Sequence, residues 1–139
     1  MPAERAFIDT NVLIYLFSDD DIDKKNITYE CINKYERFIS TQVLNEFCNV
    51  CIKKLGLSFL VIQNAVVQLC DAFNVVVNNQ ENVLNALKLH EKYGYTYYDS
   101  LIIASAIDCD CKFLLTEDLA DGQTIENNLI IHNIYSCGL

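Results

Sequence analysis

The sequence predicts an α/β protein in which a short parallel sheet is flanked by helices. Short apolar runs without polar alternation, such as "AFI" at 6–8, are typical of strands that are covered on both faces. Between these runs lie longer segments with helical periodicity. Strands that alternate with helices in this way form βαβ units and pair in parallel.

The first third of the chain begins this alternation. A strand at 6–8 precedes a helix over 12–17 and a loop over 18–21. The sequence "RFIS" at 37–40 predicts the second strand, and Ser40 is an expected N-cap for a helix over 41–55. Between these segments, apolar residues at helical spacing predict a further helix; they are Ile27, Cys31, Tyr35 and Phe38.

The rest of the chain continues the pattern. Gly56 ends the helix over 41–55, Ser58 can cap the next helix, which runs to about 71, and Gly94 ends a later one. The other expected elements are strands at 73–77, 111–115 and 129–134 and helices at 82–92 and 98–108. The helix at 98–108 has almost no polar face, which predicts that it is buried.

Length and charge narrow the functional classes. The 139 residues favour a single domain over 1–139, and the formal net charge of −9 argues against a basic, polyelectrolyte-type nucleic-acid binder. An enzyme that handles phosphate through bound metal ions stays possible. No apolar run reaches the roughly 20 residues of a membrane-spanning helix. The N-terminus lacks an apolar signal segment. We therefore expect a cytoplasmic protein without membrane contact.

The seven cysteines fit no secreted disulfide framework. Cys48-x-x-Cys51 and Cys109-x-Cys111 raise the alternative of a zinc module, but no histidine spacing supports one. We expect Cys48, Cys51 and Cys70 to act as small core hydrophobes, because each continues an apolar helical stripe. The stripes are Leu44, Phe47, Cys48, Cys51 and Leu55, and Phe59, Ile62, Val66, Leu69 and Cys70.

Asp9 interrupts the apolar run "FIDTNVLIYLF". An unpaired buried charge is costly, so this carboxylate needs a reason. In open α/β sheets, ligands bind outside the carboxyl ends of the strands, and Asp9 directly follows the first strand. We therefore expect Asp9 at the mouth of the sheet.

Three more acids are expected at the same edge. Glu46 lies early in the helix at 41–55, Asp99 opens the helix at 98–108, and Asp118 follows the strand at 111–115. Each has an ordinary alternative: a solvated helix face for Glu46, a helix-dipole acid for Asp99, and a turn acid or cap for Asp118. Their shared position favours a common site.

Other chemistries lack support. The four glycines form no Gly-rich phosphate loop. Neither His90 nor His132 accompanies a Ser or Cys nucleophile motif, and we expect His90 at the edge of the core, where it continues the stripe of Val83, Ala86 and Leu87. The run Asp-Thr-Asn also lacks the second aspartate, two residues after Asp9, that a phosphoaspartate transferase needs.

Three segments resemble the motifs of PIN-domain ribonucleases, the family that includes the toxins of VapBC-type toxin–antitoxin pairs. "FIDTNVLIYLF" resembles the first motif, "STQVLNEFCNV" the second, and "YGYTYYDSLIIASAIDCDCKFLLTEDL" the third and fourth, in family order. The resemblance implies a PIN-like three-layer sandwich, RNA cleavage that depends on a divalent metal, and frequently a homodimer.

The resemblance also implies site residues. The acids are Asp9, Glu46, Asp99 and Asp118, and the supporting residues are Thr10, Asn11 and Thr116. Asp9, Asp99 and Asp118 are the expected metal ligands, and Thr10 and Asn11 are expected to orient Asp9. Glu117 and Asp121 compete with Asp118 for the fourth position; we favour Asp118 because it fits a Thr-x-Asp pattern.

Residue chemistry agrees with these implications. Mg²⁺ and Mn²⁺ prefer oxygen ligands, and a bound metal lowers the pKa of water. Gathered carboxylates repel one another without a metal, which raises their pKa values. The resemblance implies attack by water, a 5′ phosphate product and an antitoxin protein as partner. A stand-alone RNA-processing nuclease and a non-catalytic PIN-fold module that binds RNA or protein remain alternatives. Solvated helix faces and an RNA path explain the basic residues equally well; these are Lys24, Lys25, Lys34, Arg37, Lys53 and Lys54.

Overall fold

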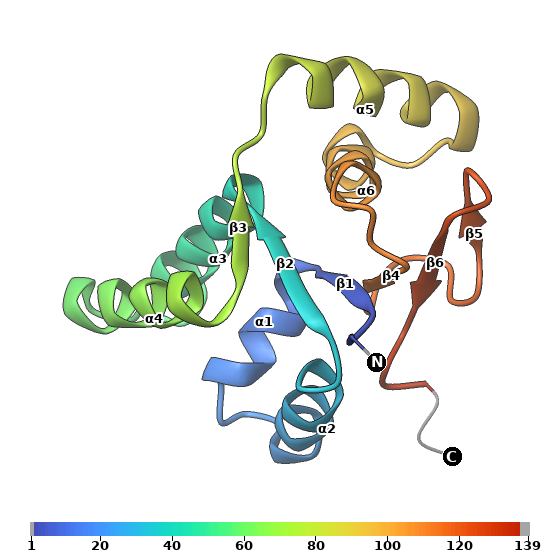
Figure 1. Cartoon of the computed structure of the whole chain (residues 1–139). Coiled ribbons are helices and arrows are strands. Elements are labelled where there is room, and N and C mark those ends of the chain that lie inside the picture. The colour runs from blue at the N-terminus through green and yellow to red at the C-terminus, as the bar shows by residue number, and fades with distance from the viewer. Residues whose placement is uncertain (1, 137–139) are drawn as a thin grey trace.

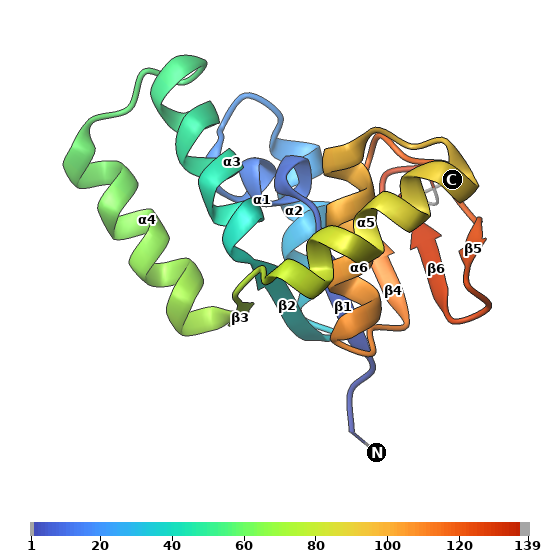
Figure 2. The same cartoon turned by 90° about the horizontal axis from the view of Figure 1, so that it is seen from above.

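A computed structural model describes residues 2–136 and contains one six-stranded sheet with helices on both faces (Figures 1 and 2). The strands are β1 (Arg5–Ile8), β2 (Glu36–Ser40), β3 (Asn74–Val76), β4 (Phe113–Leu115), β5 (Thr124–Ile125) and β6 (Leu129–His132). The helices are α1 (Thr10–Phe17), α2 (Ile22–Ile32), α3 (Thr41–Lys53), α4 (Phe59–Ala72), α5 (Gln80–Tyr93) and α6 (Tyr97–Asp108).

The strand order is β3-β2-β1-β4-β6-β5, and every pair is parallel except β5 with β6. Strand β1 lies in the middle, where Phe7 pairs with Phe38 of β2 and with Leu114 of β4. The predicted parallel α/β architecture is confirmed. Because β1 and β4 are neighbours and parallel, the residues that follow them meet at the same edge of the sheet.

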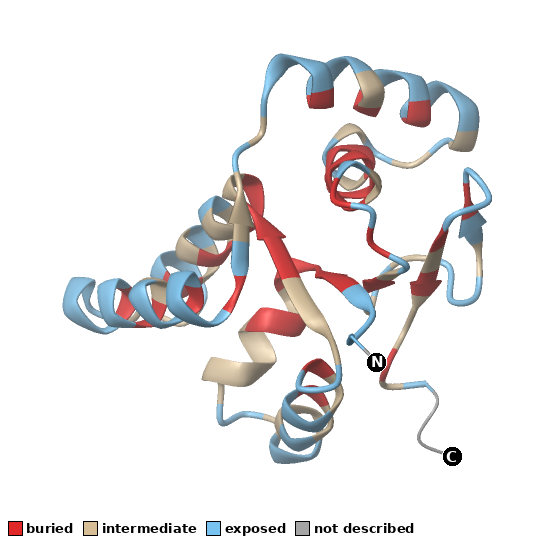
Figure 3. Ribbon diagram, viewed as in Figure 1, coloured by how far each residue is buried: buried red, intermediate tan, exposed pale blue. Residues whose placement is uncertain are grey.

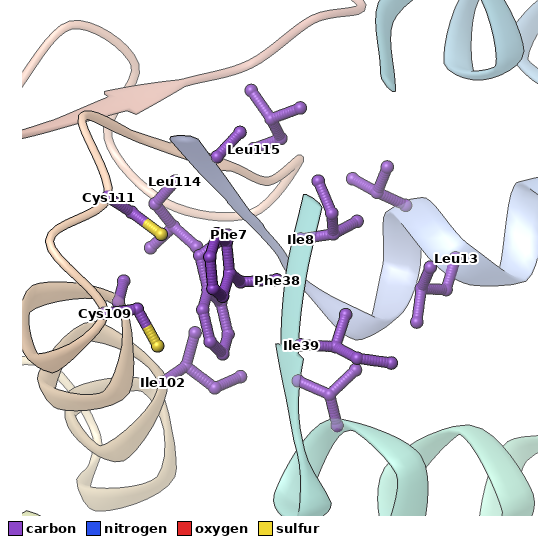
Figure 4. Packing of buried hydrophobic residues seen from close by; sticks show 14 of the residues in the cluster. Phe7, Ile8, Leu13, Phe38, Ile39, Ile102, Cys109, Cys111, Leu114 and Leu115 are labelled. Atoms are coloured by element: carbon purple, nitrogen blue, oxygen red, sulfur yellow. The ribbon is translucent and has the colours of Figure 1, made fainter. Parts of the chain in front are cut away.

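The sheet is covered on both faces. Figure 1 shows α6 between the sheet and α5, with α1 and α2 on the opposite face. Side chains that alternate along β1 and β2 serve both layers: Figure 4 shows Phe7 and Phe38 on the side of Ile102, and Ile8 and Ile39 on the side of Leu13. Helix α6 is buried almost all round, as its apolar sequence predicts (Figure 3).

Local capping signals explain where several helices begin and end. The Ser40 side chain accepts a hydrogen bond from the Val43 backbone N–H, and Ser58 accepts one from Val61. Gly94 closes α5 with a φ of 78°, in the left-handed region that favours glycine. These three predicted boundaries are confirmed.

Two predicted apolar stripes are wrong in part. Helix α2 ends at Ile32, and Phe38 belongs to β2, because the chain must turn at Tyr35 to enter the sheet. On α4, Cys70 is exposed and Phe59 is 76% exposed. Helix α4 packs chiefly against α3, so only one narrow face of α4 is buried. The buried residues of α4 are Ile62, Ala65 and Leu69.

The predicted core-edge position of His90 is also wrong. Helix α5 buries Asn82, Ala86 and Leu89 against α6, and this choice of face leaves His90 exposed. The antiparallel strand β5 was not predicted, since it contains only two residues. Of the cysteine expectations, Cys51 is buried on α3 and Cys48 is half-buried. None of the helices within residues 2–136 is long and apolar enough to cross a membrane.

Candidate active site

Four acids that are far apart in the sequence line one cleft at the carboxyl edge of the sheet. Asp9 follows β1, Glu46 lies on α3, Asp99 lies in the first turn of α6, and Asp118 lies in the loop after β4. The cleft has a volume of about 270 Å³. Its remaining lining residues are Thr10, Asn11, Asn49, Val50 and Ile102. The structure thus brings together all four acids that the sequence singles out.

Asp9 is the most buried of the four, with 7% of its surface exposed. Its Oδ1 accepts a hydrogen bond of 2.7 Å from the Thr10 N–H and so caps α1, while its Oδ2 accepts one of 2.9 Å from the Thr116 hydroxyl. Burial raises the pKa of Asp9 from 3.8 to about 6, against the two hydrogen bonds, and the charges of Glu46 and Asp99 add to the rise. Capping and a place in the acidic cleft therefore coexist in this residue.

Glu46 and Asp99 are half-buried and held in different ways. The Glu46 Oε1 accepts a hydrogen bond of 2.7 Å from the Thr10 hydroxyl, and its Oε2 accepts one of 3.4 Å from the Gln42 amide. The backbone N–H of Asp99 donates to the hydroxyl of Thr96, the N-cap of α6. The α6 cap leaves the Asp99 carboxylate on the cleft wall.

The three candidates for the fourth acid occupy different surroundings. Asp118 lines the cleft, where its carboxylate accepts a hydrogen bond from the Asn11 amide. Glu117 points to α1 and α2 and pairs with Lys24. Asp121 accepts hydrogen bonds from the Asn133 N–H at 2.8 Å and from a serine hydroxyl. Only Asp118 of the three lies among the other acids.

The partners of Thr10 and Asn11 differ from the expected ones. Their side chains bond Glu46 and Asp118, and only the Thr10 backbone bonds Asp9. The reason is helical geometry: α1 begins at Thr10, so these two side chains leave the first turn sideways toward α3 and the β4 loop. Together they connect three of the four acids through the start of one helix.

Glu117 belongs to a cluster on the other side of its loop. Lys24 forms an ion pair with it, and the Tyr15 hydroxyl donates a hydrogen bond of 2.7 Å to it. The Lys24 ammonium lies 4.9 Å from the Tyr15 ring centre and 5.2 Å from that of Tyr135. Burial alone would raise the pKa of Glu117, but the bonds from Lys24 and Tyr15 hold it below its usual value. Lys24 is therefore committed to this cluster.

Two other basic residues of the suggested RNA path are also engaged elsewhere. Lys25 pairs with Asp19 at 2.7 Å, and Arg37 donates to the Ala72 carbonyl at 3.0 Å. Lys54, by contrast, lines a hollow that adjoins the acidic cleft.

Comparison with protein families identifies the family of this chain. The model of the PIN domain matches residues 6–120, which contain all four acids. The chain belongs to the PIN-domain family. No curated protein matches its sequence.

Solved structures agree on the PIN fold. A toxin–antitoxin complex from Klebsiella pneumoniae is similar with a TM-score of 0.72 and 22% identity, over 94% of this chain and 98% of that one. VapBC2 from Rickettsia felis, bound to a promoter DNA fragment, is similar with a TM-score of 0.68 and 19% identity, over 93% of this chain and 98% of that one. The Sarcin-Ricin loop cleaving toxin VapC20 of Mycobacterium tuberculosis has a TM-score of 0.66 and 15% identity, over 78% of this chain and 86% of that one. The PIN-like fold that the motifs imply is confirmed.

The donor chemistry of this PIN domain fits a hard divalent cation. The cleft offers carboxylate and amide oxygens, which hard cations prefer. Burial, with a smaller contribution from the charges of Glu46 and Asp99, raises the pKa of Asp9. Within residues 2–136, however, no three Asp, Glu, His or Cys side chains are placed so that they could jointly hold a metal ion. The cleft therefore does not form a closed cage of protein ligands. It suits Mg²⁺ or Mn²⁺, because these ions keep several bound waters and need only one or two carboxylates.

One residue of the PIN site was underestimated from the sequence. Gln42 is buried, and its amide donates to the Tyr98 carbonyl at 3.0 Å as well as to Glu46. The sequence shows it only as part of a polar stripe that continues with Asn45, Glu46 and Asn49. Its position four residues before Glu46 is the available signal, because residues at i and i+4 meet on a helix.

Proposed function

We propose that this PIN domain is a divalent-metal-dependent ribonuclease that hydrolyses RNA phosphodiesters in the cytoplasm, as the toxin of a VapBC-type pair. The observation that carries the proposal is the convergence of Asp9, Glu46, Asp99 and Asp118 on one cleft, with the pKa of Asp9 raised. A purely structural cluster of this kind would destabilise the fold without gain. An intact acidic cleft favours a nuclease over a non-catalytic binding module.

The residues divide into ligands and a proton acceptor. Asp9, Asp99 and Asp118 are the candidate ligands: one or two of these carboxylates would bind Mg²⁺ or Mn²⁺ directly and the others through its bound waters, and the metal would supply an activated water and stabilise charge on the phosphodiester. Glu46, whose carboxylate is oriented by Thr10 and Gln42, would accept the proton that the attacking water loses. Attack at phosphorus breaks the bond to the 3′ oxygen and leaves a 5′ phosphate. Thr116 fixes the Asp9 carboxylate, and Asn11 fixes that of Asp118.

A protein partner is part of the proposal. Similar structures include a toxin–antitoxin complex and a VapBC assembly, which supports an antitoxin for this chain. Exposed apolar side chains on α4 provide surface for an antitoxin or for a second copy in a homodimer; they include Phe59, Leu60, Val61 and Val67. A stand-alone RNA-processing nuclease would share the chemistry but lack the antitoxin.

Cleavage of RNA with defined divalent ions tests the catalytic part. We expect the purified protein to cut single-stranded RNA with Mg²⁺ or Mn²⁺ and to stop in excess EDTA, with activity restored when metal is added back. An Asp9→Asn protein prepared in the same way controls for contaminating nucleases. Undiminished cleavage in EDTA, or equal cleavage by the variant, would contradict the proposal.

A further inference from the structure

Three hollows follow α3 from its beginning to its end. The acidic cleft lies at the middle, next to Glu46 and Val50. Beyond Val50 lies a hollow that is rich in charge, with Asp20, Asp21, Lys54 and Glu117 in its lining. Before Glu46 lies a pocket of about 540 Å³, which we call the amide pocket; it is lined by Thr41, Gln42, Asn45, Glu46, Asn78, Tyr98 and Leu101.

We propose that the amide pocket binds one nucleobase of the RNA beside the scissile phosphate and that this base stacks on Tyr98. The inference rests on the proposed function. Glu46 lines both the amide pocket and the acidic cleft, so a nucleotide in one is adjacent to a phosphate in the other. Among residues 2–136, Glu46 is also the only charged one in the pocket lining, which suits an uncharged base better than a phosphate.

The floor of the amide pocket is rigid. The side-chain Oδ1 of Asn78 accepts hydrogen bonds from the Thr41 hydroxyl at 3.1 Å and from the Gln42 backbone N–H at 3.0 Å. Its amide donates to the Ser105 hydroxyl at 2.8 Å, and its own N–H donates to Thr41. Asn78 thereby joins the end of β3 to α3 and α6. A site held by such a network is preorganised, so little side-chain freedom is lost when a ligand binds.

Tyr98 supplies a stacking surface at the rim. Its side chain is 64% exposed although it stands in the first turn of α6. An edge-on contact with Tyr97, with ring centres 5.4 Å apart, holds its orientation, and Gln42 holds its backbone carbonyl. Exposed aromatic rings beside a nucleic-acid path commonly stack on bases, which every base can do through its π-face.

Gln42 positions its neighbours in the pocket and offers no atom to a base. Both polar contacts of its amide nitrogen are made inside the protein, with Glu46 and Tyr98. Its side-chain oxygen is closed off from solvent, so a base in the pocket cannot reach it. A preference among bases therefore follows the strength of stacking on Tyr98, which is greater for adenine than for a pyrimidine.

Binding of short RNA by the Asp9→Asn protein tests the inference without cleavage. Fluorescence anisotropy with labelled A6, C6 and U6 in Mn²⁺ should give tighter binding for A6 than for C6 and U6, because adenine stacks more strongly than a pyrimidine. Adding Tyr98→Ala should weaken the binding of A6 by about 5- to 100-fold, the usual range for loss of one stacked base. Tyr29→Ala is the matched control, because Tyr29 is 63% exposed on α2 and lines none of the three hollows.

Tyr98→Phe separates the aromatic ring from its hydroxyl. It keeps the stacking surface, so its affinity for A6 should stay close to that of the Asp9→Asn parent; thermal melts check that each variant is folded. Equal losses for Tyr98→Ala and Tyr29→Ala, equal affinity for all three RNAs, or no RNA binding at all would overturn the inference. The expected binding pattern together with a wild-type protein that does not cut RNA would instead refute the proposed function alone.

Discussion

Asp9 and Glu117 are two carboxylates at the same edge of the sheet, and their surroundings shift their pKa values in opposite directions. Burial raises the pKa of Asp9, and its charged neighbours are other acids. Burial also acts on Glu117, but Lys24 and Tyr15 donate to it and the pKa falls. Two differences account for the opposite shifts of the pKa values. Asp9 is the more deeply buried, and Glu117 pairs with Lys24, whereas no cation lies beside Asp9 within the described residues.

The two acids differ in what they contribute to the stability of the metal-free protein. A carboxylate paired with a lysine and a tyrosine stabilises the structure as it stands. A carboxylate buried among other carboxylates is unfavourable until a cation arrives. We therefore expect substitutions at the two positions to have opposite effects on stability.

The largest effect is expected for Asp9→Asn. Removal of the charge that binds the cation should reduce RNA cleavage in Mn²⁺ by at least about a hundredfold. Asparagine is also a good N-cap, so α1 keeps its first turn. Cleavage assays, with the exposed α4 variant Asp71→Asn as the control, measure the change. A fully active Asp9→Asn protein would remove Asp9 from the site.

The second prediction concerns the pH dependence of stability in metal-free buffer. Because the folded-state pKa of Asp9 is about 6 and its ordinary value is 3.8, the folded state holds this proton more tightly. That contribution to the free energy of unfolding is complete below about pH 4. It disappears as the pH rises to about 6, a total of about 3 kcal/mol.

Urea unfolding of the parent and of Asp9→Asn in EDTA at several pH values checks this expectation. The variant should be similar in stability to the parent near pH 4 and more stable above pH 6, and saturating Mn²⁺ should narrow the gap by stabilising the parent. A difference in the free energy of unfolding that is constant across the pH range would show that the ionised Asp9 carboxylate does not destabilise the folded protein.

The smallest effect is expected for Glu117→Gln, which should lower the free energy of unfolding by about 1 kcal/mol near neutral pH. Because the pKa of Glu117 is lowered in the fold, its contribution is present above its ordinary pKa of 4.5 and is lost as the pH falls through the folded-state value. The loss should therefore vanish in acid. Glu91→Gln, an exposed acid on α5, is the control and should change stability little at any pH. Equal effects of the two variants would deny the ion pair with Lys24 a stabilising role.

The sequence predicted much of the fold and of the cleft because the signals are local. A short apolar strand followed by an acid places Asp9 at the sheet edge, and a buried helix that opens with Asp99 packs against the same sheet. The ordered motifs added Glu46 and Asp118. Such features depend on neighbours within one or two turns of chain, so they are visible without a structure.

The features that the sequence did not predict depend on contacts with residues far away in the chain. The different surroundings of Glu117 and Asp118 depend on Lys24, 93 residues from Glu117, and on Asn11, 107 residues from Asp118. The exposed position of Cys70 depends on which face of α4 meets α3, and that of His90 on which face of α5 meets α6. Both helices carry more apolar residues than one contact can cover, so periodicity alone could not choose the face.

The hydrogen bond from Thr116 to Asp9 joins residues 107 positions apart, and the Asp9 N–H bonds to the Leu115 carbonyl. Asp9 is thus synthesised 107 residues before the hydroxyl group that fixes it. A growing chain has no complete cleft until Asp118 has left the ribosome. Whatever chemistry the cleft performs is therefore absent from a nascent chain that stops short of Asp118.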